Sequence, residues 1–188
     1  MTDTHTIWRG LDPDATSLEH LSLQPWSQAT GTVVKTFDAH GYALNYSVKI
    51  GHGRFPEWVA AVVAGGAGLT LTRDAGGLWS GAEGHERRDL WGATDVDISA
   101  TPFTNSIALR RLNLAVGAVA ELLLVWIGVP DLKARPVPQR YTRLSPHTYR
   151  YENLTSGYCN ELTLDARGVE PQDSVELNHA ASTNGSIR

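Results

Sequence analysis

Hydrophobic and polar positions alternate strictly between residues 42 and 50 of the chain. A period of two places successive side chains on opposite faces of a β-strand, so this segment is predicted to be a strand with one buried face. The segment before it, residues 31–37, is rich in threonine and valine, and the link at residues 38–41 is short and ends in glycine. Together these features predict a β-hairpin.

Shorter runs of the same kind predict that strands dominate the rest of the chain. Glycine-rich segments at 65–68, 74–77 and 165–168 favour antiparallel connections over helical crossovers. A chain of about ten strands must close on itself or cover its concave face. We therefore expect a mainly β protein: a strongly curved antiparallel sheet, a spiral β-roll or half-barrel, with one or two short helices over an apolar cavity. The further predicted strands are 18–23, 58–64, 69–73, 78–80, 95–99, 140–144, 149–152 and 158–165.

Two segments need a choice between helix and strand. Residues 121–129 are apolar on both faces, which fits a central strand or a buried helix. Valine, isoleucine and tryptophan favour the strand, and Pro130 ends it. The best helix candidate is 104–114, where Thr104 or Asn105 can act as the N-cap.

The composition defines the class of protein. Of the 188 residues, 41% are hydrophobic and 19% are charged, which is typical of a packed globular domain. We expect a single domain over residues 1–188, with its core at about 7–168 and a loosely ordered tail at about 176–188. The longest apolar stretch, of about 14 residues, is too short to cross a bilayer. The first ten residues lack a signal-peptide pattern, so we expect a cytoplasmic protein with no integral membrane segment.

The net charge and the spacing of histidine and cysteine argue against nucleic-acid binding and metal binding. Sixteen Lys and Arg residues stand against 20 Asp and Glu, a net charge of −4, so we expect no nucleic-acid partner. The seven histidines and the single cysteine lack the spacing of metal ligands, so neither a metal site nor a cofactor is expected. Cys159 lies in a strand-like run, where a buried, unreactive thiol is expected.

Asp95 and Asp97 are the candidate catalytic residues, with Arg111 as a third. The two carboxylates lie two positions apart on a predicted strand, so their side chains share one face. Such a pair can serve acid–base chemistry. A solvated outer face or hydrogen bonds to a turn would explain the same spacing.

Arginines and aromatic residues are the candidate ligand-binding groups. Arg110, Arg140 and Arg143 can bind a phosphate or carboxylate head group in two-pronged fashion, or can pair internally with Asp95 and Asp97. Tryptophan and tyrosine line apolar pockets and stack on sugars, although most of the six tryptophans are expected in the core.

Six motifs, taken in order, carry a family resemblance. They are Trp8-Arg-Gly-Leu-Asp12, the stretch 95–105, Arg110-Arg-Leu112, and the stretches 129–132, 139–144 and 149–152. The chain resembles the putative glycolipid-binding domain family from Trp8 to about Gly168. The resemblance implies a spiral β-roll or half-barrel related to periplasmic lipoprotein carriers, with glycolipid binding as the expected function and no catalytic residues assigned. The matching residues are Trp8, Arg9, Asp95, Asp97, Thr104, Asn105, Arg110, Arg111, Gln139, Arg140, Tyr141, Arg143, Tyr151 and Glu152.

Two functions of different classes follow. The first is binding of a hydrophobic or amphiphilic small molecule, such as a glycolipid or an acyl or polyketide-like chain, in the cavity of the β-roll. The second is an enzyme of secondary metabolism, a cyclase or isomerase, that folds a hydrophobic substrate in the same cavity. A filled core without a ligand is the third interpretation, and a homodimer formed through an exposed sheet edge is left open. The expected ligand-binding residues are Trp8, Tyr42, Tyr46, Trp58, Asn105, Arg110, Trp126, Arg140, Tyr141, Arg143 and Tyr151.

Overall fold

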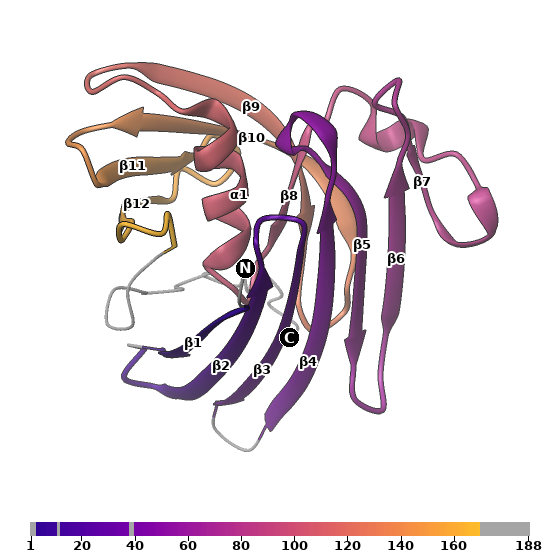
Figure 1. Cartoon of the computed structure of the whole chain (residues 1–188). Coiled ribbons are helices and arrows are strands. Elements are labelled where there is room, and N and C mark those ends of the chain that lie inside the picture. Colours follow the sequence, from indigo (N-terminus) through magenta and orange to yellow (C-terminus); the bar gives the residue numbers. More distant parts are fainter. Residues whose placement is uncertain (1–2, 11, 38–39, 170–188) are drawn as a thin grey trace, which may run out of the picture.

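The computed structural model describes residues 3–10, 12–37 and 40–169. In this part the chain forms two β-sheets and one α-helix, α1 (Phe103–Leu112), as Figure 1 shows. The predicted mainly β class and the predicted helix are confirmed. The tail expected at 176–188 and part of the expected turn at 38–41 lie outside the described residues.

Sheet A contains seven antiparallel strands in sequence order, so each strand pairs with its neighbour in the chain. The predicted hairpin is confirmed as β3 and β4, in which Gly31 lies opposite Tyr46. The sequence pattern does not predict β1, because its large apolar residues, Ile7 and Trp8, are adjacent and give no alternation. The strands are β1 (Thr4–Arg9), β2 (Ala15–Gln24), β3 (Gln28–Phe37), β4 (His40–Ile50), β5 (Pro56–Val63), β6 (Gly68–Arg73) and β7 (Trp79–Ser80).

Sheet B is a strongly curled half-barrel of five strands in the order β12-β11-β10-β9-β8. One connection departs from the predicted antiparallel pattern: β8 and β9 run parallel, and α1 lies in the crossover between them. The apolar segment at 121–129 is confirmed as a strand, β9. The strands are β8 (Asp95–Ile98), β9 (Val119–Ile127), β10 (Ala134–Arg143), β11 (Thr148–Asn153) and β12 (Cys159–Thr163).

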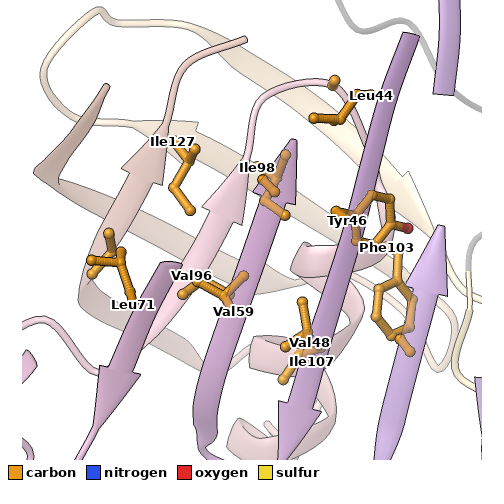
Figure 2. Packing of buried hydrophobic residues seen from close by; sticks show 14 of the residues in the cluster. Leu44, Tyr46, Val48, Val59, Leu71, Val96, Ile98, Phe103, Ile107 and Ile127 are labelled. Atoms are coloured by element: carbon orange, nitrogen blue, oxygen red, sulfur yellow. The ribbon is translucent and has the colours of Figure 1, made fainter. Parts of the chain in front are cut away.

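The hydrophobic core lies between the two sheets and includes one side of α1 (Figure 2). A second cluster joins the other side of α1 to the tyrosines of sheet B. Because both sides of the helix are covered, every residue from Phe103 to Leu109 is buried. The helix and its neighbours thus occupy the space between the sheets, where the sequence pattern suggests an apolar cavity. The core residues labelled in Figure 2 are Leu44, Tyr46, Val48, Val59, Leu71, Val96, Ile98, Phe103, Ile107 and Ile127.

The start of α1 corrects one local prediction. The helix begins at Phe103, so Thr104 and Asn105 lie inside its first turn and neither is the N-cap. The hydroxyl of Thr101 accepts a hydrogen bond from the backbone N–H of Phe103 at 3.1 Å. Thr104 faces β8 instead and accepts a hydrogen bond from the backbone N–H of Ile98.

A buried carboxyl group joins sheet A to the start of α1. Glu19 on β2 accepts hydrogen bonds from the hydroxyls of Tyr46 at 2.5 Å and Thr101 at 2.7 Å. The Tyr46 ring packs directly on Gly31, where a Cβ atom would lie 2.2 Å from the ring. Burial raises the pKa of Glu19 to about 7, and the two hydrogen bonds offset part of that rise.

We predict that Glu19→Gln removes a pH dependence of folding stability. The raised pKa means that the folded protein holds this proton more tightly than the unfolded chain. The wild type therefore loses up to about 3 kcal/mol of unfolding free energy as the pH rises from about 4.5 to about 7. Urea unfolding of both proteins at pH 5 and pH 8 measures the effect, and the variant should lose less stability between the two.

A matched control is Glu83→Gln, because the Glu83 side chain is 87% exposed. This control should follow the wild type at both pH values. A stability difference between wild type and Glu19→Gln that stays constant from pH 5 to pH 8 would contradict the prediction.

Candidate functional site

Asp95, the first candidate catalytic carboxylate, is buried and bound to an arginine. Arg111 of α1 donates from Nε to Asp95 Oδ1 at 3.1 Å and from Nη2 to Oδ2. The hydroxyl of Thr94 donates to the same Oδ2 at 2.7 Å. A two-pronged ion pair of this kind anchors α1 to β8, and it takes up both carboxylate oxygens.

Asp97 lies in a second buried network. Gln139 on β10 donates from Nε2 to Asp97 Oδ2 at 2.6 Å, and the Thr104 hydroxyl donates to Oδ1 at 3.5 Å. The hydroxyl of Tyr141 lies 2.8 Å from Oδ1 of Asn105 and 2.9 Å from Oε1 of Gln139. The network ties together β8, β10 and α1. Both aspartates are buried, so the alternative of a solvated outer face is wrong.

Tyr151 on β11 extends this network. Its ring meets that of Tyr141 edge to face, with 5.6 Å between the centroids. Burial and the charge of Asp97 raise the pKa of Tyr151 far above its usual range, so the hydroxyl keeps its proton. Residues that carry the family resemblance therefore meet in one buried place. They are Asp97, Thr104, Asn105, Gln139, Tyr141 and Tyr151.

The four aromatic residues expected to line one cavity lie in three different places. Tyr46 is buried beside the central core, and Tyr42 packs half-buried against it. Trp58 lies on the opposite face of sheet A, under a lysine ammonium 5.4 Å from its ring centre. Trp126 on β9 packs under Arg135, which lies on β10. The structure does not bring these four side chains together.

Two more expected ligand residues lie far from any shared site. Trp8 is 2% exposed and belongs to the core. Arg140 projects from sheet B between two carboxylates, with Nη2 at 2.7 Å from Glu121 and Nη1 at 3.6 Å from Glu152. Arg140, like Arg111, thus follows the interpretation of internal ion pairing.

Arg110 and Arg143 meet in a surface groove of about 250 Å³ at the C-terminal end of α1. The groove also reaches the short 3-10 turn His52–Arg54, the loop before β11 and the segment after β12. We call it the basic groove, because four arginines line it against a single carboxylate, Asp165; the arginines are Arg54, Arg110, Arg143 and Arg167, and His147 lies beside them. Leu109, Tyr149 and Leu164 contribute apolar surface, and the remaining lining residues are Asn113, Pro146, Ala166 and Gly168.

Arg110 is the least satisfied of these arginines. Its guanidinium carbon lies 4.3 Å from the ring centre of Trp26, and its Nε is buried without a hydrogen-bond partner. Burial lowers the pKa of Arg110, and the charge of Arg54 lowers it further. Among the residues that the structure describes, no carboxylate lies within ion-pair distance of Arg110. The positive charge of Arg110 is therefore open to a ligand in the groove, although its Nε is buried.

The other arginines of the basic groove differ in how their donors are used. Arg143 donates to three backbone carbonyls and lies 5.4 Å from the ring centre of Tyr149. Arg54 donates from Nη1 to the backbone carbonyl of Arg110 at 3.0 Å. Arg167 pairs with the neighbouring aspartate at 2.6 Å. Arg54 and Arg143 thus contribute positive charge that no carboxylate of the described chain neutralises.

Part of the basic groove has no local signal in the sequence. Arg110 and Arg143 are expected ligand residues, and the motif at 149–152 contains Tyr149. Trp26 and Arg54 are not predicted, because they reach α1 only in the folded chain; Arg54 and Arg110 are 56 positions apart.

A second hollow, of about 350 Å³, lies on the outer face of sheet A. Small polar and apolar side chains line it, among them Thr30, Thr32, Asn45, Ser47 and Val62. The Thr32 hydroxyl donates to the Asn45 side chain at 2.8 Å, so part of this polarity is satisfied internally. The hollow lacks the charge of the basic groove.

Two features are absent from the described part of the chain. It contains no group of three or more His, Cys, Asp or Glu residues placed to hold a metal ion. None of its helices has the length and apolar character needed to cross a membrane. Cys159 is exposed at the start of β12, so the expected burial of this thiol is wrong; it projects outward from an edge strand.

Comparisons with known proteins identify the family. A family model described as "Putative glycolipid-binding" matches residues 5–170. Among solved structures, the crystal structure of a DUF1089 family protein from Pseudomonas aeruginosa has a TM-score of 0.76 and 30% identity, covering 90% of this chain and 94% of that one. A search of curated proteins finds no match. The resemblance carried by the six motifs is confirmed, and the chain belongs to the putative glycolipid-binding family.

Proposed function

We propose that the protein binds an amphiphilic small molecule of the glycolipid type, without transforming it, and that the basic groove receives the head group. The observation that carries this proposal is the mixed lining of the groove. Guanidinium groups stand beside apolar parts of Leu109, Tyr149 and Leu164. An amphiphile uses both kinds of surface, because apolar burial supplies affinity and polar groups set the orientation. The description of the family supports the same class of ligand.

The size of the groove indicates which part of the ligand it can hold. Sites that enclose a whole drug-sized molecule have volumes of about 300 to 1,000 Å³. The basic groove, at about 250 Å³, suits a head group and the first part of a chain. Because α1 occupies the space between the sheets, we place the ligand in this surface groove rather than in the interior of the β-roll.

The contacts of the two candidate catalytic carboxylates favour binding over acid–base chemistry. Asp95 accepts hydrogen bonds from Arg111 and Thr94, and Asp97 accepts them from Gln139 and Thr104. A general acid or base must reach the proton that it transfers. Buried oxygens held by protein donors suit a positioning role, so a cyclase or isomerase is the less favoured function.

We predict that filling the groove abolishes ligand binding. Ala166 is exposed and lines the basic groove, so Ala166→Trp places a large ring there without disturbing the core. Wild type and variant would be incubated with a lipid extract of the producing cells and measured by native mass spectrometry. We expect a bound amphiphile on the wild type and at least about tenfold less on the variant, the loss of about 1.4 kcal/mol.

The matched control for this experiment is Ala82→Trp. Ala82 is also exposed, in a 3-10 turn that does not line the basic groove. It should bind like the wild type. Equal occupancy of wild type and Ala166→Trp would place the ligand elsewhere, and no bound amphiphile on any of the three proteins would overturn the proposed function.

We predict that Asp97→Asn lowers stability and leaves binding intact. An amide has one acceptor oxygen, so either Nε2 of Gln139 or the Thr104 hydroxyl loses its acceptor, at a cost of about 1–3 kcal/mol in unfolding free energy. Chemical denaturation measures the loss, and titration of the folded fraction with the bound amphiphile measures affinity. If the variant kept its stability but no longer converted the bound molecule as the wild type does, the cyclase or isomerase would be favoured instead.

A further inference from the structure

We infer that the basic groove recognises an anionic head group, a phosphate, sulfate or carboxylate, and that Arg110 and Arg54 hold it. The inference rests on the proposed function for the amphiphilic nature of the ligand, and it adds the sign of the head group's charge. It also names the two residues that select that charge.

The first support is the state of the Arg110 guanidinium. Trp26 lies beneath it and fixes its position, while its Nε has no hydrogen-bond partner and no described carboxylate pairs with it. A guanidinium held in place with open donors loses little conformational entropy when it binds an oxyanion. Arg110 is thus prepared for a two-pronged contact with phosphate or carboxylate.

The second support is the gathering of like charges. Arg54 and Arg110 line the same groove. Burial lowers the pKa of Arg110, and repulsion from the charge of Arg54 lowers it further. A bound anion would relieve this repulsion. Arg143 adds a third positive charge, although its own donors are taken by backbone carbonyls.

Among the nine other arginines of the described chain, just over half show the opposite arrangement. Five of them lie within ion-pair distance of a carboxylate, and one of the five, Arg167, is itself at the rim of the groove. Arg54, Arg110 and Arg143 lack such a partner there. The five paired residues are Arg87, Arg88, Arg111, Arg140 and Arg167.

A structural role explains only part of this cluster. The C-terminal carbonyls of a helix attract positive charge, and Arg54 does bond to one of them, the carbonyl of Arg110. That bond uses one donor of Arg54. The helix dipole also favours Arg110 in the last turn, but neither effect supplies an acceptor for its guanidinium.

The test is isothermal titration calorimetry with three probes: inorganic phosphate, dihexanoyl phosphatidic acid and octyl glucoside, the two amphiphiles below their micellar concentrations. The proteins are the wild type, Arg110→Gln, Arg54→Gln and the control Arg88→Gln. Arg88 has the same charge, but its side chain is 78% exposed and does not line the groove. Thermal unfolding of each variant confirms that it is folded, and Arg54→Gln carries the test if Arg110→Gln fails to fold.

We expect the wild type to bind phosphatidic acid at least about tenfold more tightly than octyl glucoside. Each groove variant should weaken that binding by about tenfold or more, the scale of one charge-assisted contact. Arg88→Gln should bind like the wild type. Added salt should weaken the binding of phosphatidic acid more than that of octyl glucoside, because salt screens the charged contact.

The other outcomes separate the inference from the proposed function. If octyl glucoside bound as tightly as phosphatidic acid and Arg110→Gln had no effect, the inference of an anionic head group would be wrong. The proposal of amphiphile binding would still hold. Inorganic phosphate bound through Arg110, without either amphiphile, would support the anion site and overturn the amphiphile. No binding of any probe would overturn both.

Discussion

The enclosure of α1 on both sides is the constraint on which the rest of the structure depends. A helix without a solvent-facing side buries its polar side chains, and an unpaired buried polar group is costly. Ser106 alone of the buried polar side chains of α1 has no hydrogen-bond partner among the described residues. Thr104 and Asn105 find partners on β8 and β10, and Arg111 finds Asp95. The two aspartates predicted as catalytic residues therefore bind side chains of α1 and hold the helix in place. The C-terminal end of α1, at Arg110, is the part that reaches the surface, and it opens onto the basic groove.

The predictability of each element follows the sequence range of the interactions that form it. The β3–β4 hairpin depends on local alternation and a short link, and it was predictable from those residues alone. The parallel pairing of β8 with β9 was missed, although the helix expected between two expected strands is the order of a β-α-β crossover. The N-cap prediction failed since Thr104 serves β8 rather than its own helix.

The candidate site shows the same division. The sequence identified Arg110 and Arg143 as candidate ligand residues and Asp95 and Asp97 as candidate catalytic residues. Only the folded structure shows which of these charges form ion pairs. Trp26 and Arg54 could not be predicted, since they approach α1 from distant segments. A cytoplasmic location and a homodimer stay predictions from the sequence. The site thus depends on tertiary placement more than on any motif, which agrees with a family whose fold is clearer than its ligand.

The hydrogen bond between Glu19 and Thr101 closes a segment of 82 residues. Sheet A is built from neighbouring strands, so each of its hairpins closes a short loop at small entropic cost. The contact between Glu19 and Thr101 is different, because it joins two segments that the meander does not bring together. The protonation state of Glu19 therefore acts on the joint between sheet A and the start of α1 rather than on the pairing of strands within the meander.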